Sequence, residues 1–196
     1  MRVAHGHLNR LVPEDLLEAA KVDPSVPARP SVETVLHALA LQLSGIDFVG
    51  HTHPTAINAL LCSQKAEHAF VGPLFPDEIV YCGVAPVYVP YTDPGVPLAR
   101  RVGDLMRDYV ASHGEVPKVV LMQNHGLIAL GSSARDVANI TAMAVKAARV
   151  RLGTYALGGP RFLSSQAVAR IQGELVQYAR HFGRCRLPKI RWSTVR

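Results

Sequence analysis

The segment from Lys118 to Gly131, KVVLMQNHGLIALG, constrains the fold more than any other part of this chain. Two short apolar runs, VVLM and LIAL, lie on either side of the sequence QNHG, whose residues are typical of turns. Short apolar runs bounded by turn residues are typical of buried strands. The segment therefore predicts two strands joined by a tight turn.

The residues before this segment alternate between helical and extended patterns. The order predicted is a short helix over VPEDLLEAAK, a loop over the proline-rich DPSVPARP, a helix over VETVLHALALQL that is capped by Ser31 and ended by Gly45, a strand over IDFVGHTH and a helix over TAINALLCS. Residues 67–98 are rich in proline, glycine and β-branched residues, and we expect short strands and turns there, with IVYCG and PVYVPYTDPG as strands.

Three longer helices complete the prediction. They cover residues 97–114, residues from Ser133 to about Leu157, and residues 164–182, and Ser133 with Asp136 resembles a capping box. No repeat or low-complexity segment interrupts the 196 residues. We therefore expect one domain of the mixed α/β class over residues 1–196.

Composition narrows the class of protein further. Hydrophobic residues make up 48% of the chain and charged residues 18%, which is typical of a globular protein. No apolar run is long enough to span a membrane, and the first residues do not have the pattern of a signal peptide, so we expect a cytoplasmic protein with no membrane partner. The odd number of cysteines, at Cys62, Cys82 and Cys185, predicts reduced thiols.

The positive net charge of +6 is confined to the end of the chain. Residues 180–196 contain six arginine or lysine residues and no acidic residue, so residues 1–179 are balanced. A basic tail can bind phosphate groups weakly, but no nucleic-acid-reading module is visible, and we expect no nucleic-acid partner.

Three histidines suggest a metal site. His51 and His53 are two residues apart in a predicted strand, so their side chains point to the same face with their backbones roughly 6.6 Å apart. His125 lies in a turn directly after VVLM, beside Gly126, which permits close approach of the backbone. Three imidazoles around a tetrahedral ion leave one open position, as in catalytic zinc sites, whereas a His-x-His pair alone is often an accident of surface or core.

Glu33 is the fourth candidate, because it falls in the first turn of a predicted helix. A carboxylate is stabilised there by the helix dipole, and that role alone would explain it. The functional alternative is that Glu33 faces the metal as a ligand or acts as a general base.

The motifs PSVETVLH, GHTHPTAINA and QNHGLIALG, in this order, resemble the class II aldolase/adducin family, which includes fuculose and rhamnulose phosphate aldolases. The resemblance extends from about Pro30 to Gly158. It implies a three-layer αβα fold with a central, mainly antiparallel sheet, and a homotetramer with active sites at subunit contacts. It also implies that His51, His53 and His125 bind Zn²⁺ or another divalent metal such as Mn²⁺, Fe²⁺ or Co²⁺, with Glu33 as the catalytic residue.

The function that the resemblance implies is that of a metal-dependent carbon–carbon lyase. The metal would act as a Lewis acid on a ketose-like sugar, sugar phosphate or hydroxy-keto acid, and Glu33 would transfer the proton at the enediolate carbon. A decarboxylase, an epimerase or a dehydratase would use the same site. A non-catalytic, adducin-like interaction domain and a shortened, inactive metal-binding member are further alternatives.

The substrate-binding residues are harder to identify. The family holds a phosphate partly with a serine pair before the glutamate, and here Ser31 is followed by Val32. Arg29 and Ser31 are the candidate contacts to substrate. Tyr81 and Tyr91 are candidates for the catalytic acid, with packed strand residues as the alternative. His37 is either a supporting residue of the site or a satisfied core histidine.

Overall fold

The computed structural model describes residue 21 and residues 23–27 and 30–182. The predicted helix up to residue 20, the candidate Arg29 and most of the basic tail lie outside these described residues. The helices are α2 (Thr34–Ala40), α3 (Thr55–Leu61), α4 (Ala66–Ala69), α5 (Pro76–Cys82), α6 (Val96–His113), α7 (Ala134–Tyr155) and α8 (Ser165–Phe182). The strands are β1 (Phe48–Thr52), β2 (Val87–Val89), β3 (Val119–Met122) and β4 (Gly126–Gly131).

The four strands form one sheet in the order β1-β4-β3-β2. β4 is antiparallel to both β1 and β3, and only the edge strand β2 is parallel to its neighbour β3. The predicted hairpin and the mainly antiparallel sheet are confirmed. Because Thr52 pairs with Leu127 and Met122 pairs with both Val89 and Gly126, β1, β2 and β3 all end where β4 begins.

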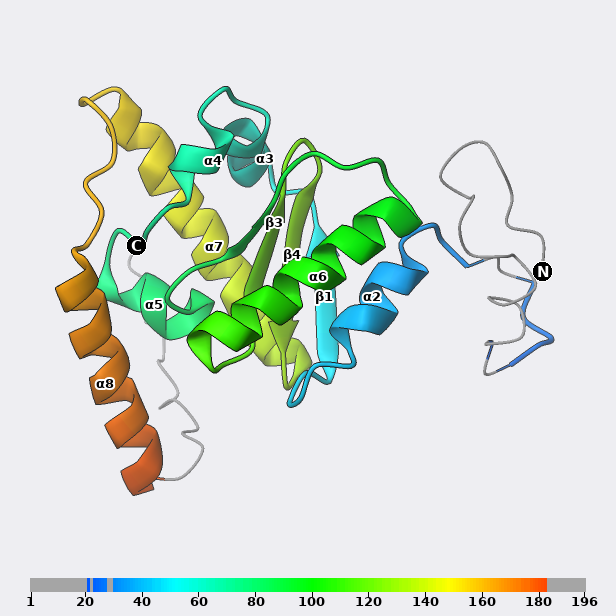
Figure 1. Cartoon of the computed structure of the whole chain (residues 1–196). Coiled ribbons are helices and arrows are strands. Elements are labelled where there is room, and N and C mark those ends of the chain that lie inside the picture. Colours follow the sequence, from blue (N-terminus) through cyan, green and yellow to red (C-terminus); the bar gives the residue numbers. More distant parts are fainter. Residues whose placement is uncertain (1–20, 22, 28–29, 183–196) are drawn as a thin grey trace, which may run out of the picture.

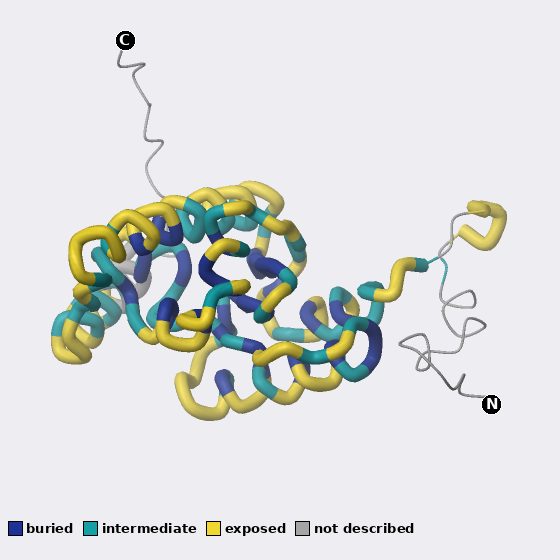
Figure 2. The backbone as a smooth tube through the Cα atoms, turned by 90° about the horizontal axis from the view of Figure 1, so that it is seen from above, coloured by how far each residue is buried: buried dark blue, intermediate teal, exposed yellow. Residues whose placement is uncertain are grey.

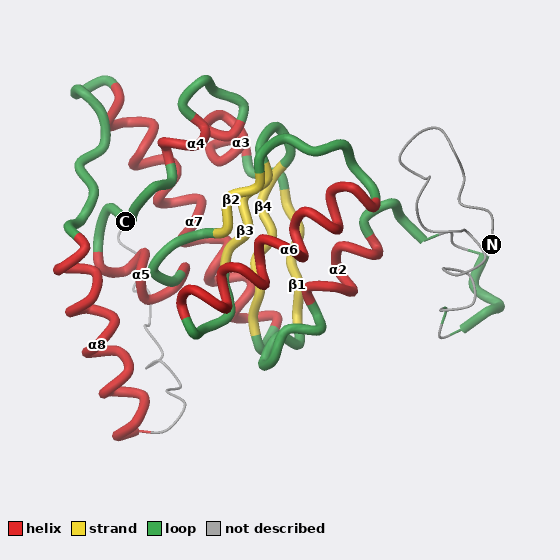
Figure 3. Tube along the Cα trace, in the orientation of Figure 1, coloured by secondary structure: helices red, strands yellow, loops and turns green. Residues whose placement is uncertain are grey.

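The sheet has a layer of helices on each face, as Figures 1 and 3 show. Val120 and Met122 of β3 pack in an apolar cluster with α2 and α6, whereas Val119 and Leu121 pack in a second cluster with α3 and α7. Successive strand residues point to opposite faces, so a strand covered on both sides is apolar throughout. Figure 2 shows the result, with buried segments inside and exposed segments on the outer sides of the helices. The predicted three-layer αβα architecture is confirmed.

Local sequence signals account for the long helices. Helix α7 begins where Ser133 Oγ accepts a hydrogen bond from the backbone N–H of Asp136 at 3.1 Å, as the predicted cap requires. Helix α6 ends at Gly114, whose φ of +69° is left-handed backbone that glycine adopts readily. The predicted helix over residues 164–182 is confirmed as α8.

The predicted strand over IVYCG is wrong, because these residues belong to helix α5. Pro76 occupies the first turn of this helix, and Asp77 and Glu78 follow it close to the positive end of the helix dipole. These start signals outweigh the strand preference of Ile79, Val80 and Tyr81, which are too few to form an alternating pattern. The other strand predicted in this region is confirmed only over Val87–Val89, as β2, and residues 90–95 are loop and turn.

Helix α2 is shorter than predicted. It begins at Thr34, with Glu33 at the N-cap position, and it ends at Ala40. Ser31 does not cap it, because Ser31 Oγ accepts the backbone N–H of Glu33 at 3.3 Å and the chain turns before the helix starts. Glu33 therefore lies one residue before the helix and not inside its first turn.

No helix among the described residues is long and apolar enough to cross a membrane. Cys62 and Cys82 are free thiols, as predicted, and Cys185 lies outside the described residues. That residues 1–196 form a single domain with a basic tail from about residue 180 stays a prediction, because both ends of the chain lie outside the description.

Candidate metal centre

Strand β1 directs the first two histidines to the face of the sheet that carries α2. A Cβ atom on Gly50 would overlap with Val137 Cγ1 at 2.3 Å, so the even-numbered side of β1 faces α7 with no room for a side chain at Gly50. His51 therefore points the other way, toward α2, and its ring centroid lies 5.8 Å from that of His37 on α2. His53 follows the strand, and its Nε2 atom is 2.8 Å from Nε2 of His51.

The turn between β3 and β4 places the third histidine at the same end of the sheet. Asn124 has a φ of +56°, which asparagine tolerates better than most residues, and the backbone N–H of His125 donates to the carbonyl of Met122 at 3.1 Å. The side-chain amide of Asn58 on α3 donates to the carbonyl of His125 at 3.0 Å. The turn is thus held from both sides, with its imidazole directed at His51 and His53.

Gly126 is required for the two histidine segments to approach each other. A Cβ atom at this position would lie 2.4 Å from Cδ2 of His53 and 2.7 Å from the backbone oxygen of Thr52. Any larger residue would therefore displace His53 or the end of β1. The expected close approach at Gly126 is confirmed.

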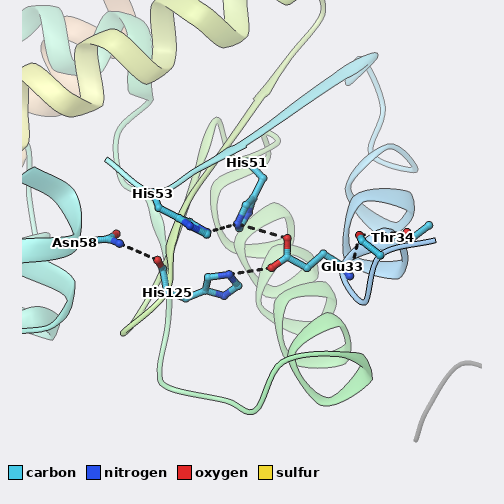
Figure 4. Close-up of polar contacts among 7 residues, drawn as sticks. Glu33, Thr34, His51, His53, Asn58 and His125 are labelled. Atoms are coloured by element: carbon cyan, nitrogen blue, oxygen red, sulfur yellow. Dashed lines mark hydrogen bonds and ion pairs between the residues drawn. The ribbon is translucent and has the colours of Figure 1, made fainter. Parts of the chain in front are cut away.

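Glu33 completes the cluster from a third direction, as Figure 4 shows. Its Oε1 atom lies 2.9 Å from Nε2 of His125, and its Oε2 atom lies 3.6 Å from Nε2 of His51. The side chain makes no capping hydrogen bond to α2. The carboxylate is directed into the histidine cluster, so helix capping does not explain its position.

Burial keeps one of these imidazoles neutral. The His51 side chain is only 9% exposed. Its pKa is lowered to about 4, chiefly because burial disfavours the charged ring, while the carboxylate of Glu33 opposes the shift and the neighbouring histidines add to it. At neutral pH His51 therefore has a free lone pair, which a metal ligand requires.

The donor set suits a divalent transition metal. One nitrogen of each of His51, His53 and His125 lies within 4.8 Å of the others, and Glu33, His37 and His51 form a second such group. Imidazole nitrogens with a nearby carboxylate are ligands that zinc and its neighbours accept, and three imidazoles leave a position for substrate. The residues present therefore fit a metal of this kind.

The predicted substrate residues have different positions. Tyr91 follows β2 at the same end of the sheet as His125; its backbone N–H donates to Oε1 of Gln123 at 3.1 Å and its side chain is exposed. Ser31 is exposed in the turn before Glu33. Tyr81, by contrast, lies on α5 and packs against the cluster on the α7 side of the sheet, away from the face that carries His51. Arg29 lies outside the described residues.

Two supporting residues were missed by the sequence analysis. Asn58 holds the His125 turn, and Gln123 ties that turn to Tyr91. The only signal for Asn58 was a polar side chain within the apolar run TAINALL. Gln123 gave none, because a glutamine in a turn is ordinary.

Comparison with known proteins supports the resemblance to the class II aldolase/adducin family. A family model, the class II aldolase and adducin N-terminal domain, matches residues 5–152, which is more than half of the chain. No curated protein matches. Among solved structures, YgbL from Klebsiella pneumoniae, described as a candidate aldolase, epimerase or decarboxylase, is 25% identical over 73% of this chain and 66% of its own, with a TM-score of 0.60.

Two further structures are similar. YgbL from Escherichia coli is 25% identical with a TM-score of 0.54, over 73% of this chain and 66% of its own. An L-fuculose 1-phosphate aldolase has a TM-score of 0.61 at 20% identity, over 76% of this chain and 66% of its own, and so shares the fold. This chain spans just under two thirds of the length of each. The family model matches most of the chain, and the arrangement of helices around the sheet agrees with it. The chain therefore belongs to the class II aldolase and adducin N-terminal domain family.

Proposed function

We propose that this chain is a metal-dependent carbon–carbon lyase of the aldolase type. Its substrate would be a sugar, a sugar phosphate or a hydroxy-keto acid, cleaved next to its carbonyl group. The observation that carries the proposal is the convergence of Glu33 with His51 and His125, at 3.6 and 2.9 Å, in a family that typically uses a divalent metal. Members of this family also bind small-molecule substrates.

His51, His53 and His125 would hold the ion, which we take to be zinc or one of manganese, iron and cobalt. When bound, the metal supplies a Lewis acid for the carbonyl and neighbouring hydroxyl oxygens of the substrate. The histidines come from β1, from the residue after β1 and from the β3–β4 turn, so the sheet itself sets their separation. Because strands are rigid elements, a site anchored on them already has its geometry before the substrate binds.

Glu33 would hold and transfer the proton at the carbon that becomes negatively charged when the bond breaks. Its side chain is 23% exposed, so a substrate can reach the carboxylate. A base of this kind must lie within hydrogen-bond reach of the proton that it removes. Tyr91, exposed at the same end of the sheet, is the better candidate for the catalytic acid, and Ser31 and Arg29 remain candidate substrate contacts.

A second candidate function is decarboxylation or epimerisation by the same residues, with dehydration as a related possibility. The likeness to the two YgbL structures, at 25% identity, favours it. These reactions also place negative charge next to a carbonyl, so the same groups would serve. The presence of all three histidines and Glu33 supports both enzymatic proposals over a non-catalytic interaction domain of the adducin type.

The test combines metal analysis with a substrate screen. Purified protein should contain about one zinc or similar ion per chain, and a chelator should remove it. The variant His125→Ala should lose the metal, whereas His68→Ala, at an exposed histidine on α4, should retain it. The screen measures carbonyl products and released carbon dioxide from sugar phosphates and hydroxy-keto acids. Metal without turnover on any member of the panel would favour an inactive metal-binding protein.

A further inference from the structure

Two buried nitrogen atoms lie next to the proposed metal centre without a protein partner. They are Nδ1 of His51 and Nε2 of His37, and among the described residues neither has a hydrogen bond. Leaving a buried polar atom unpaired costs roughly 1–3 kcal/mol. Two such atoms on neighbouring rings can be satisfied by one shared partner.

The positions of the two rings allow one water molecule to serve both. His37 lies one helical turn after Glu33, and its backbone N–H donates to the carbonyl of Glu33 at 3.1 Å. The ring centroids of His37 and His51 lie 5.8 Å apart, and one ring nitrogen of each lies within 4.8 Å of the other and of a carboxylate oxygen of Glu33. A water with hydrogen bonds of about 2.8 Å on each side bridges two rings at this separation.

The tautomer of His51 determines what this water must do. Nε2 of His51 faces His53 and Glu33, so it must keep its lone pair to act as a ligand. A neutral imidazole with a free Nε2 carries its hydrogen on Nδ1, and that N–H needs an acceptor. In metalloproteins this second nitrogen almost always has one, which fixes the ring orientation.

We propose that His37 is a positioning residue: one bridging water accepts the Nδ1–H of His51 and donates to Nε2 of His37, which fixes the tautomer and rotation of His51. The inference rests on the proposed metal centre and deepens it. It assigns α2 two roles, because the same helix start provides Glu33 and, one turn later, the group that orients a ligand. His37 itself does not touch the metal or the substrate.

The first test is zinc affinity, measured by competition with a chromophoric chelator. His37→Leu keeps most of the side-chain volume but removes the polar atom, and should weaken zinc binding about 10–100-fold. His37→Gln keeps a polar atom near the Nε2 position and should restore most of the affinity. His68→Leu is the matched control at an exposed histidine and should leave the zinc affinity unchanged. Equal affinity in wild type and His37→Leu would overturn the proposal.

The second test needs no metal. In metal-free protein with ¹⁵N-labelled histidine, long-range ¹H–¹⁵N spectra should show His51 as the Nδ1–H tautomer in the wild type and in His37→Gln, and a tautomer mixture in His37→Leu. An Nε2–H tautomer in the wild type would overturn the role of His37 even if His37→Leu fails to fold. A wild type that binds no zinc would refute the proposed function instead, and the spectra would still decide the role of His37.

Discussion

Glu33 lies 2.9 Å from His125 and 3.6 Å from His51, although it occupies the N-cap position of α2, where a side chain could have bonded the helix instead. The carboxylate therefore contacts the histidine cluster and makes no capping hydrogen bond to the helix. In the proposed function the three histidines would hold the metal, so Glu33 is the residue whose substitution would separate catalysis from metal binding alone.

Glu33→Gln tests this separation at nearly constant volume. A positioned general base contributes roughly 10²–10⁴-fold, so turnover of an identified substrate should fall by that factor. Metal content should stay near one ion per chain, because the three histidines are intact. The exposed Glu67→Gln serves as the control. An unchanged rate in Glu33→Gln would exclude Glu33 as the base.

The thiol of Cys82 should be unreactive in the folded protein. Burial, helped by the charge of Glu78, raises its pKa to about 12 from an ordinary value of 9.0. At pH 8 the reactive thiolate is then a very small fraction, and its fraction rises only as the pH approaches 12. Alkylation followed by mass mapping should label the exposed Cys62 and leave Cys82 unlabelled until denaturant is added. Equal labelling of both in native protein would contradict the burial.

At the scale of elements, the site depends on how closely β1 approaches the β3–β4 turn. Gly126→Ala would place a Cβ atom 2.4 Å from the ring of His53 and 2.7 Å from the backbone of Thr52. Overpacking of this kind costs typically 1–3 kcal/mol, and here relief also requires His53 to move. We therefore expect lower stability in urea unfolding together with weaker metal binding.

Gly153→Ala is the matched control for Gly126→Ala. Gly153 lies in α7 with open space around its Cα, so an added methyl group meets nothing. Alanine is favoured over glycine inside a helix by about 0.5–1 kcal/mol. This variant should raise the free energy of unfolding and leave the metal affinity unchanged. If both variants destabilised equally, the steric account of Gly126 would be wrong.

At the scale of the whole molecule, Arg151 ties α7 to the segments that cover the same face of the sheet. Its guanidinium donates to Oε1 of Glu78 at 2.7 Å and to the carbonyls of Ala69 and Gly72 at 2.8 Å each. Glu78 in turn accepts the backbone N–H of Leu74 at 2.8 Å. Both members of the pair are almost fully buried, with 3% and 11% of their side chains exposed.

Arg151→Met should destabilise the protein by about 3–5 kcal/mol, because it leaves a buried carboxylate unpaired. The double variant Arg151→Met with Glu78→Gln removes the uncompensated charge and should recover part of this loss. Urea unfolding monitored by circular dichroism measures both. A single variant as stable as the wild type would show that the pair contributes no net stability.

The homotetramer also belongs to this scale and stays a prediction. Family members often form oligomers, and the end of α7 and the turn after it expose large apolar side chains, with Leu152 and Tyr155 each more than a third exposed and Leu157 88% exposed. Exposed apolar residues of this size are found at interaction surfaces. Light scattering of the purified protein should give the mass of four chains, and a monomer at micromolar concentration would argue against shared active sites.

The sequence by itself determined the features that depend on local chemistry. The hairpin at residues 118–131, the capped helix α7 and the shared side of His51 and His53 follow from apolar periodicity, capping residues and the alternation of a strand. The prediction failed where helix and strand signals competed. In IVYCG the helix-start residues of α5 outweighed the strand preference of the β-branched residues.

Only the tertiary structure decided which distant groups meet. His51 and His125 are far apart in the sequence, and no local sequence pattern predicts that they meet. Their approach depends on the sheet register and on the absence of a side chain at Gly126. Arg151 on α7 meets Glu78, which lies 73 residues away on α5, just before residues that were predicted as a strand. Tyr81 and Tyr91 looked equivalent in the sequence, and the sheet separates them because its two faces and its ends are defined only once all four strands have paired.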